Sequence, residues 1–168
     1  MRTSVSRLAA KIKVGDSLPA ASIFLGVPPV ATNVVERFGK GRIIIFGVPG
    51  AFTPGCTKTH LPGYVKDADK LKAKANAKEI ICISVNDSFV MEAWANQYDP
   101  SKKIVVASDV NADFATKTGL AIDLPVLGGK RSSRFAMIVN DGTVEFLAEE
   151  PDGKGLSCSL SDSLLAKL

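Results

Sequence analysis

The sequence predicts a single α/β domain in which a central mixed sheet is flanked by helices on both faces. Two continuous apolar runs, residues 42–48 and 79–85, are typical of buried strands, and each is followed by residues with helical periodicity. Closer to the C-terminus, Asn140-Asp141-Gly142 separates two further apolar runs, which is a strong hairpin signal. Strand–helix alternation therefore gives way to an antiparallel pair, and the sheet is expected to be mixed.

The first part of the chain predicts little regular structure. Residues 12–24 form a loose β-like stretch, and the Pro28-Pro29 pair then breaks the chain before the strand at 42–48. The next element is a helix expected from residue 57 to about residue 74.

A proline and a glycine inside this helix predict a local disturbance. Pro62 lacks a backbone donor and clashes with the preceding turn, so Pro62-Gly63 is expected to kink or fray the helix. The helical pattern continues beyond the two residues, and we expect the helix to continue with it.

The middle of the chain repeats the strand–helix order. After the strand at 79–85, Asn86-Asp87 is a plausible helix cap, and residues 88–97 have helical periodicity. A third strand is expected at residues 103–107, followed by a short helix at 113–118.

The C-terminal part supplies the antiparallel pair. Residues 134–139 and 143–147 are the two strands of the predicted hairpin, and a last helix is expected over 160–166, capped by Ser159 or a nearby hydroxyl. This order of elements is that of thioredoxin-like folds.

Composition bounds the possible functions. The chain has 168 residues, of which 46% are hydrophobic and 23% are charged, as expected for one domain, here residues 12–168 after a flexible leader at 1–11. Its 21 Lys and Arg exceed its 17 Asp and Glu by four, and they are scattered, so nucleic acid is not an expected partner. No apolar run is long enough for a membrane span or a secretory signal, so an intracellular, soluble protein is expected.

Three cysteines and one histidine are the candidates for chemistry: Cys56, Cys82, Cys158 and His60. No pair has the close spacing of zinc or iron–sulfur ligands, so a metal site is not expected. Cys56 ends the segment Pro-Gly-Ala-Phe-Thr-Pro-Gly-Cys, residues 49–56, which connects the strand at 42–48 to the following helix. A thiol in the first turn of a helix lies near unpaired N–H groups and the positive end of the dipole, which favours a reactive thiolate.

The pattern Pro49-x-x-x-Thr53-x-x-Cys56 resembles the active-site signature of the peroxiredoxin family, and in its detail the atypical two-cysteine, peroxiredoxin-5 subfamily. The resemblance covers nearly the whole chain from residue 12. Beyond the signature it rests on four further segments: residues 58–63, 84–87, 133–135 and 150–153. It implies a thioredoxin-dependent peroxidase on a thioredoxin-like fold, a homodimer without metal or organic cofactor, which reduces hydrogen peroxide, alkyl hydroperoxides and peroxynitrite.

The residues of the signature make chemical sense of that activity. Cys56 as thiolate would attack the peroxide and become a sulfenic acid. Thr53 can place its hydroxyl against thiolate and peroxide, a role compatible with capping the helix, and a backbone N–H of Gly55 or Cys56 can bind the oxygen that becomes negative. Pro49 would shield the thiolate from water. Arg134 matches the active-site arginine of the family, and its fixed charge can favour the thiolate and orient the peroxide.

The resemblance also gives the second cysteine its role. Cys158 stands in a glycine-rich loop before the last helix, at the position of the resolving thiol of the subfamily. It implies that Cys158 condenses with the sulfenic acid of Cys56 in an intramolecular disulfide. The alternative is an exposed thiol without function.

Other residues near the site receive structural interpretations. Cys82 lies between two isoleucines and is expected to be buried and inert. His60 lies one helical turn after Cys56, so it is either a base for the thiol or, more simply, a packed and hydrogen-bonded helix residue. Residues 124–127 could line an apolar side of the pocket.

Two alternative functions use the same residues. A peroxide sensor would pass oxidation from the cysteine pair to a partner protein, without efficient turnover by thioredoxin. A cysteine hydrolase would use Cys56 with His60, but no third group that orients the histidine is evident.

The two terminal segments resemble targeting signals. The leader at residues 1–11 is basic and free of acids, like a mitochondrial presequence, although it is short. Ala166-Lys167-Leu168 is a variant of the Ser-Lys-Leu peroxisomal signal. The resemblance adds that the subfamily is commonly shared among cytoplasm, mitochondrion and peroxisome.

Overall fold

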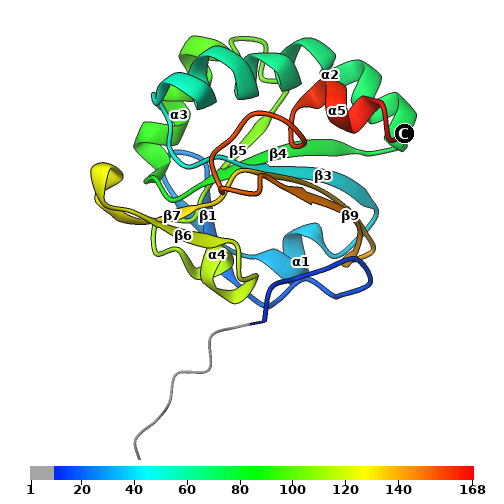
Figure 1. Ribbon diagram of the computed structural model, residues 1–168, viewed down its shortest axis with the longest axis horizontal. Coiled ribbons are helices and arrows are strands. Elements are labelled where there is room, and N and C mark those ends of the chain that lie inside the picture. The colour runs from blue at the N-terminus through cyan, green and yellow to red at the C-terminus, as the bar shows by residue number, and fades with distance from the viewer. Residues whose placement is uncertain (1–9) are drawn as a thin grey trace, which may run out of the picture.

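The computed structural model describes residues 10–168 and has a seven-stranded mixed sheet between two layers of helices (Figure 1). Most of the predicted leader, residues 1–9, therefore lies outside the described residues. The strand order is β2-β1-β5-β4-β3-β8-β9. The strands of this sheet are β1 Ser22–Leu25, β2 Val30–Asn33, β3 Arg42–Gly47, β4 Glu79–Ser84, β5 Val105–Ser108, β8 Phe135–Asn140 and β9 Thr143–Glu149.

Helices cover both faces of the sheet, as the sequence predicts. Figure 1 shows α2, α3 and α5 on one side and α1 and α4 on the other. The helices are α1 Val34–Phe38, α2 Leu61–Ala75, α3 Ser88–Tyr98, α4 Asp113–Lys117 and α5 Ser161–Leu165. In the part of the chain that the structure describes, no helix has both the length and the apolar character needed to cross a membrane.

The two apolar runs of the sequence are the central strands β3 and β4, which pair in parallel. Their side chains alternate between the two cores: Ile44 and Phe46 belong to the cluster under α2 and α3, whereas Ile43 and Ile45 belong to the cluster on the opposite face. Because both faces are covered, the interior positions of both strands are apolar, which explains a continuous hydrophobic run instead of an alternating one.

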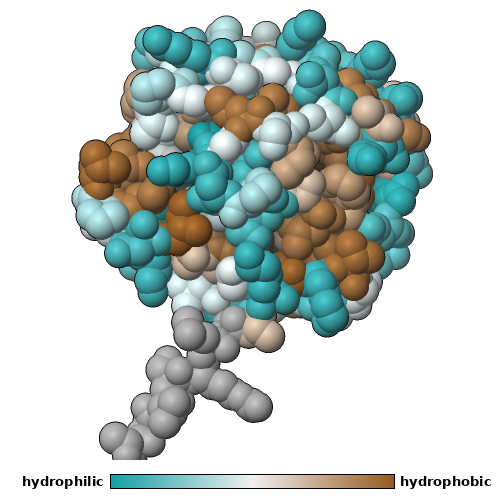
Figure 2. Space-filling model, in the orientation of Figure 1, coloured by the Kyte–Doolittle hydropathy of each residue, from teal (hydrophilic) through white to brown (hydrophobic). Residues whose placement is uncertain are grey.

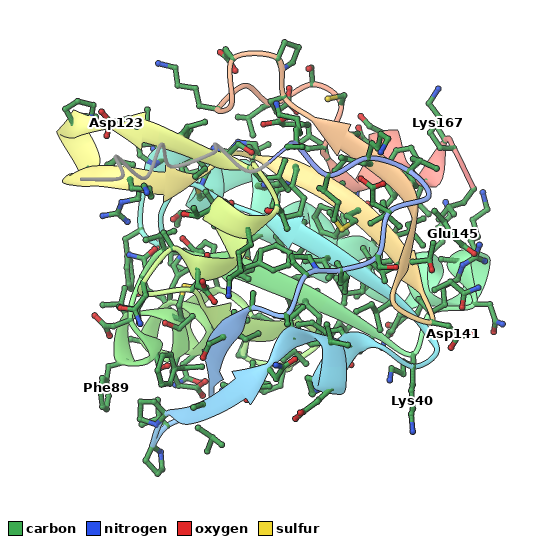
Figure 3. The ribbon with its side chains drawn as sticks, turned by 90° about the horizontal axis from the view of Figure 1, so that it is seen from below. Lys40, Phe89, Asp123, Asp141, Glu145 and Lys167 are labelled. Atoms are coloured by element: carbon green, nitrogen blue, oxygen red, sulfur yellow. The ribbon has the colours of Figure 1, made fainter. Side chains whose placement is uncertain are left out.

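The predicted hairpin is confirmed. β8 and β9 pair antiparallel, and Asp141 and Gly142 of the connecting turn have φ values of +47° and +78°. Positive φ at both central residues is the geometry that favours Asp-Gly in two-residue hairpins. Asp141 lies next to Lys40 in Figure 3, and its carboxylate accepts a hydrogen bond from the backbone N–H of Gly41 at 2.8 Å.

The prediction of a β-like stretch over residues 12–24 is wrong for most of its length, since only Ser22–Leu25 forms a strand there. Ile12 and Leu18 bury their side chains in the core from irregular backbone. Their N–H groups donate singly to the carbonyls of Thr118 and Gly142. Before Ser22 the apolar pattern therefore reflects burial, with one isolated β-bridge between Ser17 and Thr143.

A second sheet was not predicted. It is the antiparallel pair β6 Ala121–Leu124 and β7 Gly129–Ser132, joined by the 3₁₀ turn η2 Pro125–Leu127. This hairpin projects from the domain, and Figure 2 shows hydrophobic atoms at its tip. Val126 of η2 is 89% exposed, so this residue of the predicted apolar wall faces solvent.

Gly47, the last residue of β3, leaves no room for a side chain. A Cβ at this position would lie 2.2 Å from Cε1 of the fully buried ring of Phe135. We expect Gly47→Ala to lower the free energy of unfolding by about 2–3 kcal/mol or more, because the ring cannot move aside in a close-packed core. Urea unfolding checks this value. Adding Phe135→Leu should return part of the loss, and strict additivity of the two changes would contradict this steric origin.

Candidate active site

Cys56 stands where the chain leaves the sheet and enters a helix. It opens a π-helical turn, η1 Cys56–His60, which runs without interruption into α2. The backbone N–H of Leu61 donates to the carbonyl of Cys56, one residue further along than in an α-helix. The first helical hydrogen bond joins Thr57 N to Thr53 O, so the N–H groups of Gly55 and Cys56 precede the ladder and have no helical acceptor.

The expected disturbance at Pro62-Gly63 takes the form of this wide turn. Pro62 is the second residue of α2 and has no N–H to donate to the turn before it, and the helix continues to Ala75. The wider π-helical turn ends where the proline begins.

Side chains from two sides hold the segment that leads to Cys56. Asn86 follows β4, and its side-chain oxygen accepts hydrogen bonds from the backbone N–H of Ala51 and from the hydroxyl of Ser84. The hydroxyl of Thr53 donates to the carbonyl of Gly50 at 2.7 Å. Because its proton is committed there, Thr53 Oγ1 has lone pairs left to accept a hydrogen bond from a peroxide. Pro49 is buried.

Arg134 brings a charge to the thiol from a distant part of the sequence. It is only 4% exposed, and its Nη2 donates to Sγ of Cys56 at 3.4 Å. Its Nε donates to the carbonyl of Lys154 at 3.2 Å. Since a guanidinium is a donor only, the sulfur of the fully buried Cys56 accepts this hydrogen bond from a group with a fixed positive charge.

His60 is a structural bridge. Its Nδ1 lies 3.1 Å from Nη1 of Arg134, and its Nε2 lies 3.1 Å from the carbonyl of Ser159. Because the arginine can only donate, Nδ1 must accept, and the proton sits on Nε2. Both ring nitrogens are thus occupied, which leaves no lone pair for Cys56 and argues against the cysteine hydrolase. Burial, aided by the charge of Arg134, lowers the pKa of His60 to about 3.

This pKa predicts acid sensitivity. In the unfolded chain His60 takes up a proton below about pH 6.5, whereas in the fold it stays neutral down to about pH 3. Its contribution to stability is therefore complete above pH 6.5 and is lost as the pH falls towards 3. We expect the free energy of unfolding to drop by about 2–3 kcal/mol between pH 7 and pH 4.5.

Urea titrations at several pH values measure this loss, and His60→Gln is the matched variant, because His60 is the only histidine of the chain. Glutamine can still donate to Ser159 but cannot titrate. The variant should show a flatter pH dependence over this range, and a slope equal to that of the wild type would contradict the assignment.

Gly55 lies against the arginine. A Cβ there would lie 3.2 Å from Nη2 of Arg134 and 3.4 Å from Cδ1 of Leu156. A glycine thus lets the helix start approach both the guanidinium and the loop that contains Leu156.

Cys158 is half-buried on that loop, between β9 and α5, and the structure holds it as a free thiol, like Cys56 and Cys82. Its Sγ lies 3.4 Å from the carbonyl oxygen of Glu149, and its N–H donates to the carboxylate of Glu150 at 2.9 Å. Burial, together with the negative charge of Glu150, raises the pKa of the Cys158 thiol. Cys158 is therefore held as a protonated thiol.

Cys82 is fully buried in β4. Its register partner in β3 is Phe46, and burial, with the charge of Cys56, raises its pKa well above the ordinary value. The burial that the sequence predicts for this cysteine is confirmed. Among residues 10–168, no cluster of three or more His, Cys, Asp or Glu side chains could hold a metal ion.

Sequence reasoning missed two polar side chains of this region. Glu150 is 1% exposed and accepts hydrogen bonds from the loop around Cys158, and Asn86, predicted only as part of a cap, holds the segment before Cys56. The cap predicted at Asn86-Asp87 is confirmed at Asp87, whose carboxylate accepts from Val90 N. The cap expected for the last helix is wrong, because Leu160 precedes α5 without a side-chain cap bond and the Ser159 hydroxyl donates to Glu150. A buried carboxylate cannot be told from an exposed one in a single sequence.

The chain is similar to a known protein family and to known proteins over most of its length. Residues 13–163 match the model of the Redoxin family. Peroxiredoxin-2B of Arabidopsis thaliana is 40% identical over 161 residues, which cover 94% of this chain and 99% of that protein.

Two solved structures are similar in sequence and fold. Reduced Prx3 of Vibrio vulnificus in complex with hydrogen peroxide is 39% identical, with a TM-score of 0.87 over 93% of this chain and 95% of that chain. Peroxiredoxin 5 of Alvinella pompejana is 35% identical, with a TM-score of 0.79 over 94% of this chain and 99% of that chain. The thioredoxin-like fold that the sequence predicts is confirmed.

Proposed function

This chain belongs to the peroxiredoxins of the Redoxin family and is a thiol peroxidase, and we propose that Cys56 is its peroxidatic residue, with Thr53 and Arg134 completing the catalytic set. The observation that carries the proposal is the contact of the buried Arg134 guanidinium with Cys56 Sγ at 3.4 Å. A fixed cation beside a thiol at a helix start is the environment in which a cysteine becomes a nucleophile.

In the first step the thiolate attacks the terminal oxygen of a hydroperoxide ROOH. The S–O bond forms as the O–O bond breaks, which leaves Cys56 as a sulfenic acid and releases RO⁻, which takes up a proton as water or alcohol. Negative charge grows on the leaving oxygen. The free N–H groups of Gly55 and Cys56 and the guanidinium of Arg134 are the donors available to it, while the Thr53 hydroxyl accepts from the peroxide.

In the second step Cys158 resolves the sulfenic acid. Its thiol attacks the sulfur of Cys56, a disulfide forms and water leaves. Thioredoxin then reduces the disulfide by thiol–disulfide exchange and is itself oxidised. The placement of Cys158 on the loop whose Lys154 carbonyl contacts Arg134 supports this role, as does the similarity to a peroxiredoxin 5. We assign the chain to the peroxiredoxin-5 subfamily on this basis.

Substrate, assembly and compartment belong to the same proposal. Hydrogen peroxide is supported by the relative that is described in complex with it, and alkyl hydroperoxides and peroxynitrite share the O–O bond that the chemistry needs. The active form is a homodimer, which sedimentation can test. Cytoplasm, mitochondrion and peroxisome are the proposed compartments, and microscopy of the protein tagged internally can test them.

Peptide mass spectrometry after one equivalent of hydrogen peroxide tests the proposal. The reduced wild type should yield a single cross-link, Cys56–Cys158, and thioredoxin with its reductase should reverse it. Cys82→Ser, which alters only the inert thiol, should give the same link. Oxidation of Cys56 without the link would indicate a one-cysteine peroxidase or a sensor, and a Cys56 that stays reduced while another thiol reacts would overturn the assignment.

A further inference from the structure

A buried carboxylate contacts the loop of Cys158 and takes no part in the chemistry above. Glu150 follows β9 directly and is 1% exposed. Its Oε1 accepts hydrogen bonds from three consecutive backbone N–H groups, those of Ser157, Cys158 and Ser159, at 2.8 Å, 2.9 Å and 3.0 Å. The hydroxyls of the two serines donate to the same carboxylate at 2.6 Å and 2.7 Å.

These bonds define a clamp, by which we mean the Glu150 carboxylate with residues 157–159. Buried carboxylates are costly unless all their lone pairs are used, and five donors satisfy this one. Burial alone would raise the pKa of Glu150, but the hydrogen bonds from Ser157 and Ser159 outweigh it and hold the pKa at about 2. The clamp is therefore charged at every pH at which the enzyme works.

The far end of the clamp supports the peroxidatic site. The carbonyl of Ser159 accepts hydrogen bonds from Tyr64 Oη at 2.8 Å and from His60 Nε2. The other ring nitrogen of His60, Nδ1, accepts a hydrogen bond from Arg134. The polar atoms thus form one chain: clamp, His60, Arg134 and the sulfur of Cys56.

The same loop touches Arg134 at its backbone. The N–H of Arg134 donates to the carbonyl of Gly153 at 2.7 Å, and the N–H of Glu150 donates to the carbonyl of Arg134 at 2.9 Å. Lys154 accepts from the guanidinium Nε. A closed loop therefore fixes the arginine. A loop that opens withdraws two acceptors that orient Arg134, the carbonyls of Gly153 and Lys154.

Formation of the disulfide by Cys158 requires the loop to open. In the structure the sulfur of Cys158 lies against the carbonyl of Glu149, and that of Cys56 lies against Arg134. A disulfide needs the two sulfurs about 2 Å apart, so Cys158 has to leave its hydrogen bonds before it can attack. The hydrogen bond from the Cys158 N–H to the Glu150 carboxylate is one of those that must break. The negative charge of Glu150 also disfavours the thiolate of Cys158 while the loop is closed.

We propose that Glu150 is a positioning residue whose clamp on residues 157–159 favours peroxide reduction at Cys56 and restrains disulfide formation by Cys158. The proposal rests on the resolving role of Cys158 proposed above. It predicts that weakening the clamp moves the two half-reactions in opposite directions. A residue that merely stabilised the fold would not do so.

The test measures the two half-reactions separately in Glu150→Gln, which keeps the shape of the side chain but removes its charge. Sulfenic acid formation is followed by rapid quenching and mass spectrometry in a Cys158→Ser background, so that resolution cannot interfere. Its conversion to the Cys56–Cys158 disulfide is followed with both cysteines present. Hydrogen exchange at residues 154–159 reports loop opening.

We expect Glu150→Gln to slow the oxidation of Cys56 and to speed disulfide formation, each by roughly three- to tenfold, since a charge-assisted hydrogen bond is replaced by neutral ones. Exchange at residues 154–159 should quicken. Glu149→Gln is the matched control, because among residues 10–168 this neighbouring carboxylate forms an ion pair with the exposed Lys11 alone, and both rates should stay unchanged. Ser157→Ala removes a single hydroxyl from the clamp, so it should give a smaller shift of the same pattern even where Glu150→Gln folds poorly.

The outcomes separate the two proposals. Rates in Glu150→Gln and Ser157→Ala that match those of Glu149→Gln, or a fall in both half-reactions, would overturn the role of Glu150 while the cysteine cycle stands. A wild type that forms no Cys56–Cys158 disulfide overturns the resolving role of Cys158, and the clamp proposal falls with it.

Discussion

Replacement of Arg134 by glutamine is expected to slow the reaction of Cys56 with hydrogen peroxide by about 10²–10³-fold, or about 3–4 kcal/mol of transition-state stabilisation. The change removes the only fixed charge that the structure shows in contact with the thiol, at 3.4 Å in a site from which water is excluded. It also removes a donor to the leaving oxygen. Stopped-flow kinetics of the reduced protein at several peroxide concentrations measures the second-order rate constant directly.

Two further arginine substitutions show whether the loss of rate comes from the charge of Arg134, from its shape or from any surface arginine. Arg134→Lys keeps the charge but cannot reach Cys56, His60 and Lys154 with one planar group, so we expect an intermediate loss. Arg42→Gln removes an exposed ion pair with Glu145 at the start of β3 and should leave the rate unchanged. A rate in Arg134→Gln within threefold of the wild type would mean that backbone donors alone activate the thiol.

The part of the fold that the sequence predicts best is the part that is buried on both faces. β3 and β4 are continuous apolar runs because helices cover both sides of them, and the Asp141-Gly142 turn demands residues that tolerate positive φ. These signals are local and unambiguous.

Elements held by distant contacts escape prediction. β7, with the sequence Gly-Lys-Arg-Ser, has no strand propensity, but it pairs with β6, and the side chain of Arg131 donates at 3.0 Å to the carbonyl of Val85, 46 positions earlier. The missed strand β2 and helix α1 are short, and Asn33, which caps α1, is their clearest signal.

The candidate site divides in the same way. Thr53 and Cys56 lie in one short motif, whereas Arg134 immediately precedes β8, 78 positions beyond Cys56, and its role could be inferred only from the family resemblance. In isolation it would pass for a surface charge. In the fold Arg134 is buried and donates a hydrogen bond to the thiol. Glu150 and His60 are likewise buried, and their hydrogen-bond partners also lie far along the chain.

The second large effect concerns Cys158. Cys158→Ser should reduce steady-state peroxidase turnover with thioredoxin by at least about 100-fold, because the sulfenic acid of Cys56 then has no internal thiol with which to condense. The rate of the first oxidation should change little, since Cys158 donates to the Glu149 carbonyl and does not touch Cys56 in the reduced protein. Turnover is measured by NADPH consumption with thioredoxin and its reductase, and the first step by stopped flow.

The contrast between the two rates is what identifies a resolving cysteine. Serine is close in size to cysteine and can keep the bond to Glu149, so the clamp and Arg134 should stay in place and the fold should be preserved. Excess peroxide should then drive Cys56 beyond the sulfenic acid to the sulfinic acid, because the intermediate persists, and mass spectrometry detects this as one further oxygen. Retention of full turnover in Cys158→Ser would show that thioredoxin attacks the sulfenic acid directly, and loss of the first oxidation as well would show that Cys158 supports the site and does not resolve it.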